Sequence, residues 1–183
     1  MKIYAVNGSP NKNGNTNTLL ERYIEGVLSK HTDAEVKKID LIDLNINYCV
    51  GCMRCNSDKN TSCISKDDME SIYSELTTSD VIVLTSPIYW FDMTAQLKTF
   101  IDRLSPLLGG SSMKGKKLVF LSTYAGFDHV SSGAENAYKI MKSTSEIFGM
   151  DYSYFGVSTE MMKKPVSVNS KAHVDIVDFA KRL

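Results

Sequence analysis

The chain has 183 residues, of which 43% are hydrophobic and 23% are charged, which is ordinary for one soluble globular domain. Lys+Arg and Asp+Glu are equal at 21 each, so the charge balance gives no basic footprint for nucleic acid or an anionic membrane. The first residues, MKIYAVNGSP, reach a turn too early for a signal peptide, and no apolar run has membrane-spanning length. We therefore expect a single cytoplasmic domain over residues 1–183, with neither nucleic acid nor membrane as a partner.

Short apolar runs alternate along the chain with segments of helical period. Strands are predicted at Lys2–Asn7, Ala34–Leu41, Val81–Thr85, Lys117–Ser122 and Tyr152–Ser158. Helical faces are predicted within residues 19–28, 69–76, 97–104, 137–148 and 176–183. Five strands separated by helices predict right-handed crossovers and a three-layer α/β sandwich around a parallel sheet. Such sheets bind ligands beyond the carboxyl ends of their strands, where the strand order reverses.

The loop after the first predicted strand reads GSPNKNGNTN and leads into a helix. Its hydroxyls, side-chain amides and glycines at a helix N-terminus suit a phosphate group. The loop is neither G-x-G-x-x-G nor a P-loop, which disfavours a dinucleotide fingerprint and a nucleoside triphosphatase. A polar turn that merely caps the helix, through Thr16 or Asn17, explains the same residues equally well.

Two further loops follow the third and fourth predicted strands. The first, SPIYWFDM, carries the sole tryptophan of the chain and could wall a flat ring, although covering the end of the sheet is an alternative role. The second, TYAGF, has small residues that let the backbone approach a ligand closely. A phosphate seat, an aromatic wall and a close backbone approach together favour a mononucleotide with a flat ring, such as FMN.

The residues GSP-x-K-x-GNT, followed by SPIYW and AQLKTFIDRL, resemble the flavodoxin-like NAD(P)H-dependent FMN reductase superfamily. This resemblance runs from the first strand to about Gly126 and implies the strand order 2-1-3-4-5, NAD(P)H as co-substrate, and a homodimer or homotetramer. It also implies an FMN site made of three groups of residues. The phosphate group is Ser9, Asn11, Asn15, Thr16 and Asn17. The ring group is Pro87, Ile88, Tyr89, Trp90 and Phe91. The group at the ring edge or ribityl chain is Thr123, Tyr124, Ala125 and Gly126.

All four cysteines of the chain fall in one segment with the spacing Cys-x2-Cys-x2-Cys-x7-Cys: Cys49, Cys52, Cys55 and Cys63. The opening C-x2-C-x2-C is shared with bacterial ferredoxins, whereas zinc sites more often use two separated pairs. The spacing also resembles that of the iron–sulfur flavoproteins, a branch of the same superfamily, in which these positions hold a [4Fe-4S] cluster. A cluster, unligated thiols, zinc and a redox disulfide all stay open.

No catalytic side chain is expected, because FMN carries the redox chemistry and His31, His129 and His173 are isolated. The expected function is transfer of electrons from NAD(P)H to a flavin, quinone, azo or nitro compound, or an iron–sulfur centre. One alternative is an iron–sulfur flavoprotein that carries electrons and is reduced by ferredoxin. Another is a redox sensor with a structural flavin and oxidant-responsive thiols.

Overall fold

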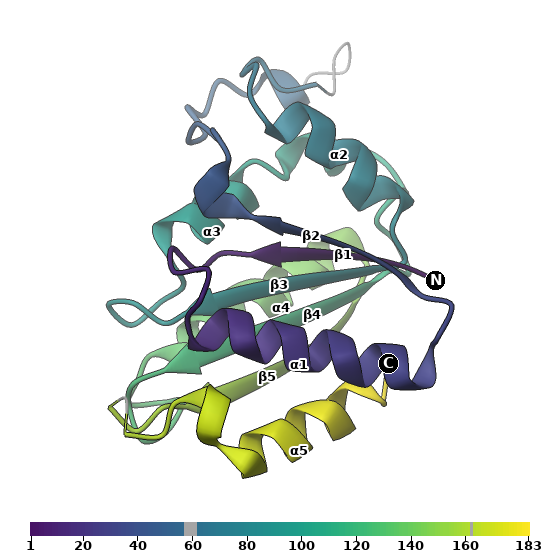
Figure 1. Ribbon diagram of the computed structural model, residues 1–183. Helices are drawn as coiled ribbons and strands as arrows, with labels where there is room; N and C mark the ends of the chain where they lie inside the picture. Colours follow the sequence, from purple (N-terminus) through teal and green to yellow (C-terminus); the bar gives the residue numbers. More distant parts are fainter. Residues whose placement is uncertain (57–61, 162) are drawn as a thin grey trace.

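The computed structural model describes residues 1–56, 62–161 and 163–183 (Figure 1). The strands are β1 (Lys2–Asn7), β2 (Glu35–Asp40), β3 (Val81–Pro87), β4 (Lys117–Tyr124) and β5 (Asp151–Ser158). The α-helices are α1 (Asn15–Lys30), α2 (Met69–Thr78), α3 (Ala95–Asp102), α4 (Ala134–Phe148) and α5 (Ser170–Ala180). Short 3-10 helices are η1 (Leu41–Asp43), η2 (Arg54–Asn56), η3 (Ser105–Leu107) and η4 (Val166–Val168).

The five strands form one parallel sheet in the order β2-β1-β3-β4-β5, which confirms the predicted fold class. Helices α1 and α5 cover one face of this sheet, and α2, α3 and α4 cover the other (Figure 1). Strand β3 is buried along its whole length because it lies between both helical layers, which explains its continuous apolar sequence. None of the helices in the described part of the chain has the length and apolar character needed to cross a membrane.

The strand order reverses at β1, which has β2 on one side and β3 on the other. The loop that follows β1 contacts β3 at this point, where the Gly8 N–H donates to the carbonyl oxygen of Thr85 at 2.8 Å. A Cβ atom at Gly8 would lie 2.7 Å from that oxygen, so only glycine permits this approach. The fold thus opens a crevice where ligands bind in doubly wound sheets.

A tight contact between β5 and α4 gives a first prediction. A Cβ at Gly156 would lie 1.9 Å from the hydroxyl of Tyr138, which is hydrogen-bonded to Ser122 at 2.9 Å. We expect Gly156→Ala to lower the free energy of unfolding by about 1–3 kcal/mol, because extra volume in a packed region forces neighbours to move. Urea unfolding followed by circular dichroism measures the change.

Two variants control for this prediction. Gly110→Ala adds a methyl group where the nearest heavy atoms are 3.9–4.0 Å away, so its stability should change by less than about 0.5 kcal/mol. Tyr138→Phe in the Gly156→Ala background removes the clashing oxygen and should restore most of the loss. Unchanged stability of Gly156→Ala would show that strand β5 lies farther from α4 than the structure has it.

Candidate functional site

A cavity of about 160 Å³ lies at the carboxyl ends of the strands and is formed by the loops that follow β1, β3, β4 and β5. Its lining combines residues far apart in the chain: Ser9, Asn11, Gly14, Asn15, Thr16, Pro87, Ile88, Tyr89, Thr123, Tyr124, Ala125 and Thr159. No lining residue carries a formal charge, so hydroxyls, amides and backbone groups supply the polar surface. The cavity lies at the switch point that the sequence predicted.

The loop after β1 is fixed by hydrogen bonds from its own polar side chains. The Oδ1 atom of Asn7 accepts from the Ser9 N–H at 3.1 Å and from the Thr85 hydroxyl at 3.0 Å. The Ser9 hydroxyl in turn accepts from the Asn11 N–H at 3.2 Å. These contacts hold the loop against β3 and place Ser9, which is 4% exposed, at the base of the cavity.

Helix α1 begins directly at the cavity. Its N-cap residue is Gly14, which has no side chain to accept a hydrogen bond from the first turn. The first turn also contains no acidic residue that would compete for the positive end of the helix dipole. Thr16 is 2% exposed, and its hydroxyl lies 2.7 Å from that of Thr123. This uncapped helix start, flanked by hydroxyls, fits a phosphate group.

The carboxyl ends of β3 and β4 and the loops that follow them form the rest of the cavity lining. The Ile88 N–H donates to the Thr123 carbonyl at 2.8 Å and so joins the loop after β3 to the end of β4. Pro87, Ile88 and Tyr89 present apolar and aromatic surface to the cavity, and the backbone of Thr123 to Ala125 runs alongside. Apolar and aromatic surface beside exposed backbone groups suits a flat ring with polar edges, and most of the residues that the sequence predicted for FMN line this cavity.

Four predicted FMN residues do not line this cavity. The Asn17 side chain donates to Glu21 and accepts from Lys38, toward β2. Trp90 is 93% exposed and Phe91 is 56% exposed, at the tip of the loop after β3. Gly126 lies one residue beyond the lining, where its carbonyl accepts from the Ser158 hydroxyl. The role of these four residues in FMN binding stays a prediction.

Two lining residues, Gly14 and Thr159, are absent from the predicted set. Gly14 is visible in the sequence as the glycine directly before Asn15, and the uncapped helix start is the reason it matters. Thr159 follows the end of β5, and its N–H donates to the Tyr124 carbonyl at 2.8 Å. Its only sequence signal is its place after the last predicted strand.

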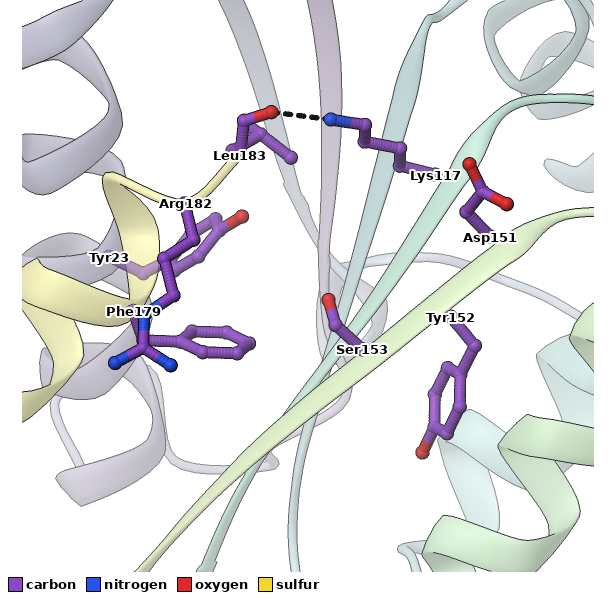
Figure 2. Close-up of a pocket in the computed structure, with 8 residues that line it drawn as sticks. All are labelled: Tyr23, Lys117, Asp151, Tyr152, Ser153, Phe179, Arg182 and Leu183. Atoms are coloured by element: carbon purple, nitrogen blue, oxygen red, sulfur yellow. Dashed lines mark hydrogen bonds between the residues drawn. The ribbon is translucent and has the colours of Figure 1, made fainter.

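A second cavity, of about 370 Å³, lies at the amino ends of β4 and β5, at the other end of the strands from the first cavity (Figure 2). It is lined by Tyr23, Lys117, Asp151, Tyr152, Ser153, Phe179, Arg182 and Leu183, and none of these belongs to the predicted site. Its volume falls within the usual range of ligand pockets, about 300–1,000 Å³, whereas the volume of the first cavity lies below that range. We place the site at the first cavity because helix α1 begins there and the strands end there.

The four cysteines carry unbridged thiols, of which Cys49 and Cys52 are exposed and Cys55 and Cys63 are half-buried. Residues 57–61 of this segment lie outside the described residues. In the part of the chain that the structure describes, no group of three or more His, Cys, Asp or Glu side chains converges to hold a metal ion. The metal site at these cysteines stays a prediction.

A buried ion pair ties the two ends of the cysteine segment together. Arg103 follows α3, and its Nη1 donates to the Asn47 carbonyl at 2.6 Å and to Asp67 at 2.7 Å. The Arg103 and Asp67 side chains are 1% and 0% exposed. Burial would raise the pKa of Asp67, but hydrogen bonds from Arg103 and from the N–H groups of Asn47 and Met69 outweigh it and lower this pKa to about 2. Asp67 therefore stays ionised.

Arg103 also faces Cys63. Burial raises the pKa of this thiol, yet its hydrogen bond to Ser65 and the nearby guanidinium of Arg103 lower the pKa below its ordinary value overall. The sequence predicts Asp67 and Asp68 only as the acidic start of the helix that bears Met69. Helix α2 does begin at Met69, but the ion pair with Arg103 has no sequence signal.

The family model described as NADPH-dependent FMN reductase matches residues 1–160. An iron–sulfur flavoprotein of Archaeoglobus fulgidus is 32% identical over 177 residues, which cover 93% of this chain and 78% of the relative. Another, from Methanocaldococcus jannaschii, is 33% identical over 116 residues, which cover 63% of this chain but only 58% of the relative. Among solved structures, an NAD(P)H:quinone oxidoreductase from Methanothermobacter marburgensis superimposes with a TM-score of 0.76 at 14% identity, covering 100% of this chain and 96% of that one.

Proposed function

The chain belongs to the NADPH-dependent FMN reductase family, and on that premise we propose that it is an FMN-dependent oxidoreductase that takes electrons from NAD(P)H. The observation that carries the proposal is that one cavity has both the uncapped start of α1 and the aromatic side chain of Tyr89 in its lining. Bound FMN supplies the redox chemistry, since it accepts hydride and passes on one or two electrons. The residues of the chain bind this cofactor and orient it.

In this proposal the cavity divides between the two parts of the cofactor. Backbone N–H groups of the first turn of α1, with the hydroxyls of Ser9 and Thr16, hold the phosphate without a formal positive charge. Pro87, Ile88 and Tyr89 lie along the ring. The segment from Thr123 to Ala125 offers backbone groups to the ring edge and the ribityl chain. The small side chain of Ala125 lets a ligand approach the backbone closely there.

Mixing the FMN-loaded protein anaerobically with NADPH or NADH tests the proposal. We expect the visible absorbance band of the flavin to bleach within seconds with at least one of them, because reduced flavin lacks that band. Free FMN mixed with the same nicotinamide, without protein, is the control. Flavin that stays oxidised with both nicotinamides would contradict the enzyme proposal.

A second candidate is an electron carrier with a [4Fe-4S] cluster at Cys49, Cys52, Cys55 and Cys63. It is favoured by the 32% identity to a protein named as an iron–sulfur flavoprotein. The described residues do not bring these thiols together, so no step of the proposed function depends on a cluster. Iron and acid-labile sulfide measured on anaerobically purified protein test for the cluster, with the fourfold Cys→Ser variant as control, and their absence would contradict this second candidate.

We further propose that the acceptor is a flavin, a quinone, or an azo or nitro compound. The fold that this chain shares with a quinone oxidoreductase is compatible with that range but selects no member of it. A homodimer or homotetramer and a single domain over residues 1–183 are part of the same proposal. Turnover of each acceptor class by the reduced protein ranks the acceptors.

A further inference from the structure

The loop after β3 ends in a tight turn with an unusual backbone. Tyr89 and Asp92 pair across it: the Tyr89 N–H donates to the Asp92 carbonyl at 2.8 Å, and the Asp92 N–H donates to the Tyr89 carbonyl at 3.2 Å. The two central residues, Trp90 and Phe91, have φ angles of 50° and 69°. Turns of this kind normally use glycine, asparagine or aspartate, because bulky L-residues disfavour positive φ.

Folding stability does not account for this turn. Trp90 is 93% exposed, and Tyr89 and Phe91 are more than half exposed, so little apolar surface is buried in return for the strain. Strained backbone persists where the surrounding structure fixes it, and it gathers at ligand sites. Tyr89 lines the cavity at the carboxyl ends of the strands. The strain therefore lies one residue from the proposed flavin wall.

Two residues at the start of α4 contact the turn from outside. Gly133 packs directly on Phe91, where a Cβ atom at Gly133 would lie 2.4 Å from the Phe91 Cα. Gly133 itself has a φ angle of 79°, which disfavours any other residue. A side chain at this position is therefore disfavoured both by the backbone conformation and by the clash with Phe91. The Asn136 side-chain amide donates to the Phe91 carbonyl at 3.0 Å. Helix α4 thus contacts the turn by packing at Gly133 and by a hydrogen bond at Asn136.

We propose that Gly133 and Asn136 are positioning residues, which hold the strained Tyr89–Asp92 turn and thereby keep Tyr89 on the wall of the flavin cavity. The proposal rests on the proposed function for its ligand. The claim that Gly133 and Asn136 hold the turn does not depend on any ligand. Neither residue lines the cavity, so both act through the turn.

Asn136→Ala tests the proposal in the full chain. Loss of one hydrogen bond to the turn should raise the FMN dissociation constant about three- to tenfold. Because Trp90 is the only tryptophan, its fluorescence anisotropy in flavin-free protein reports on this turn alone, and we expect added fast local motion. Ser143→Ala, an exposed change on the same helix, is the matched control and should alter neither quantity.

A second pair of variants separates positioning from general stability. Glycine at position 91 adopts a positive φ without strain, so Phe91→Gly removes part of the need for Asn136. Adding Asn136→Ala to Phe91→Gly should therefore raise the FMN dissociation constant less than Asn136→Ala does alone. An equal increase in both backgrounds overturns the proposal. Gly133→Ala should weaken FMN binding more than Asn136→Ala, since it clashes with backbone.

Each outcome of the Asn136→Ala measurement is decisive. Weaker FMN binding together with a looser turn supports the proposal. Unchanged anisotropy overturns it, whatever happens to FMN binding, because Asn136 then does not hold the turn. A looser turn with unchanged FMN binding also overturns it, because the turn then does not position the cavity wall. If the wild-type protein binds no FMN, the proposed function fails, and anisotropy alone decides whether Asn136 holds the turn.

Discussion

Replacing Arg103 with methionine should lower the free energy of unfolding by about 3–5 kcal/mol, because it leaves the buried Asp67 carboxylate without its partner. The same change removes the hydrogen bond from Arg103 to the Asn47 carbonyl at 2.6 Å, which lies just before the cysteine segment. Urea unfolding of wild type and variant at pH 7 measures the difference. Lys98→Met, which breaks the exposed pair with Asp102, is the matched control and should cost less than about 0.5 kcal/mol.

The dependence of the free energy of unfolding on pH, below about pH 4, tests the same ion pair. The pKa of Asp67 is about 2 in the folded protein, below its ordinary value of 3.8, so the folded state binds fewer protons than the unfolded state. This contribution is fully present above about pH 4 and is lost as pH falls from there toward 2. Asp67→Asn should remove this part of the acid dependence. An Arg103→Met variant as stable as wild type would show that the pair contributes nothing.

The second large effect is expected at Thr16, in the first turn of α1. Thr16→Leu should weaken FMN binding at least about a hundredfold, which corresponds to about 2.7 kcal/mol. Leucine at this buried position removes the hydroxyl and places a larger apolar side chain where the phosphate is proposed to lie. Ser9→Leu, at the base of the same cavity, should act in the same direction. Fluorescence titration of flavin-free protein with FMN measures both.

Thr16→Ser keeps the hydroxyl that lies 2.7 Å from Thr123, so its FMN affinity should stay within about threefold of wild type. Circular dichroism and thermal unfolding of each variant separate lost binding from lost folding. Wild-type FMN affinity in a folded Thr16→Leu variant would place the phosphate away from α1. It would then contradict the division of the cavity proposed above, while leaving the family of the chain unaffected.

The spacing of the four cysteines along the chain does not by itself determine how their thiols are arranged in space. Its spacing matches a cluster motif, yet Cys49 and Cys52 are exposed and the described thiols do not converge. What the structure adds is the anchoring of both flanks: the Asn47 carbonyl and the Asp67 carboxylate both bind Arg103, and Asn45 and Asp68 exchange hydrogen bonds at 3.2 Å and 2.7 Å. The segment is thus held at its base by residues that the motif does not include.

The sequence by itself determined the sheet, its helical layers and the loops that form the cavity. Apolar runs and helical periods are local properties, and the rules for parallel sheets convert their order into a topology. For that reason the first strand has the predicted bounds, and Ser9, Thr16 and Tyr89 fall at one cavity.

Only the tertiary structure decided which residues of those loops line the cavity and what fixes them. Thr159 lines the cavity because β5 lies beside β4. Trp90 does not line it, because the turn after β3 points the Trp90 side chain into solvent. Arg103 and Asp67 meet across 36 positions of sequence, and Gly133 meets Phe91 from another helix. Such contacts depend on the packing of whole elements against one another, which no spacing along the chain encodes.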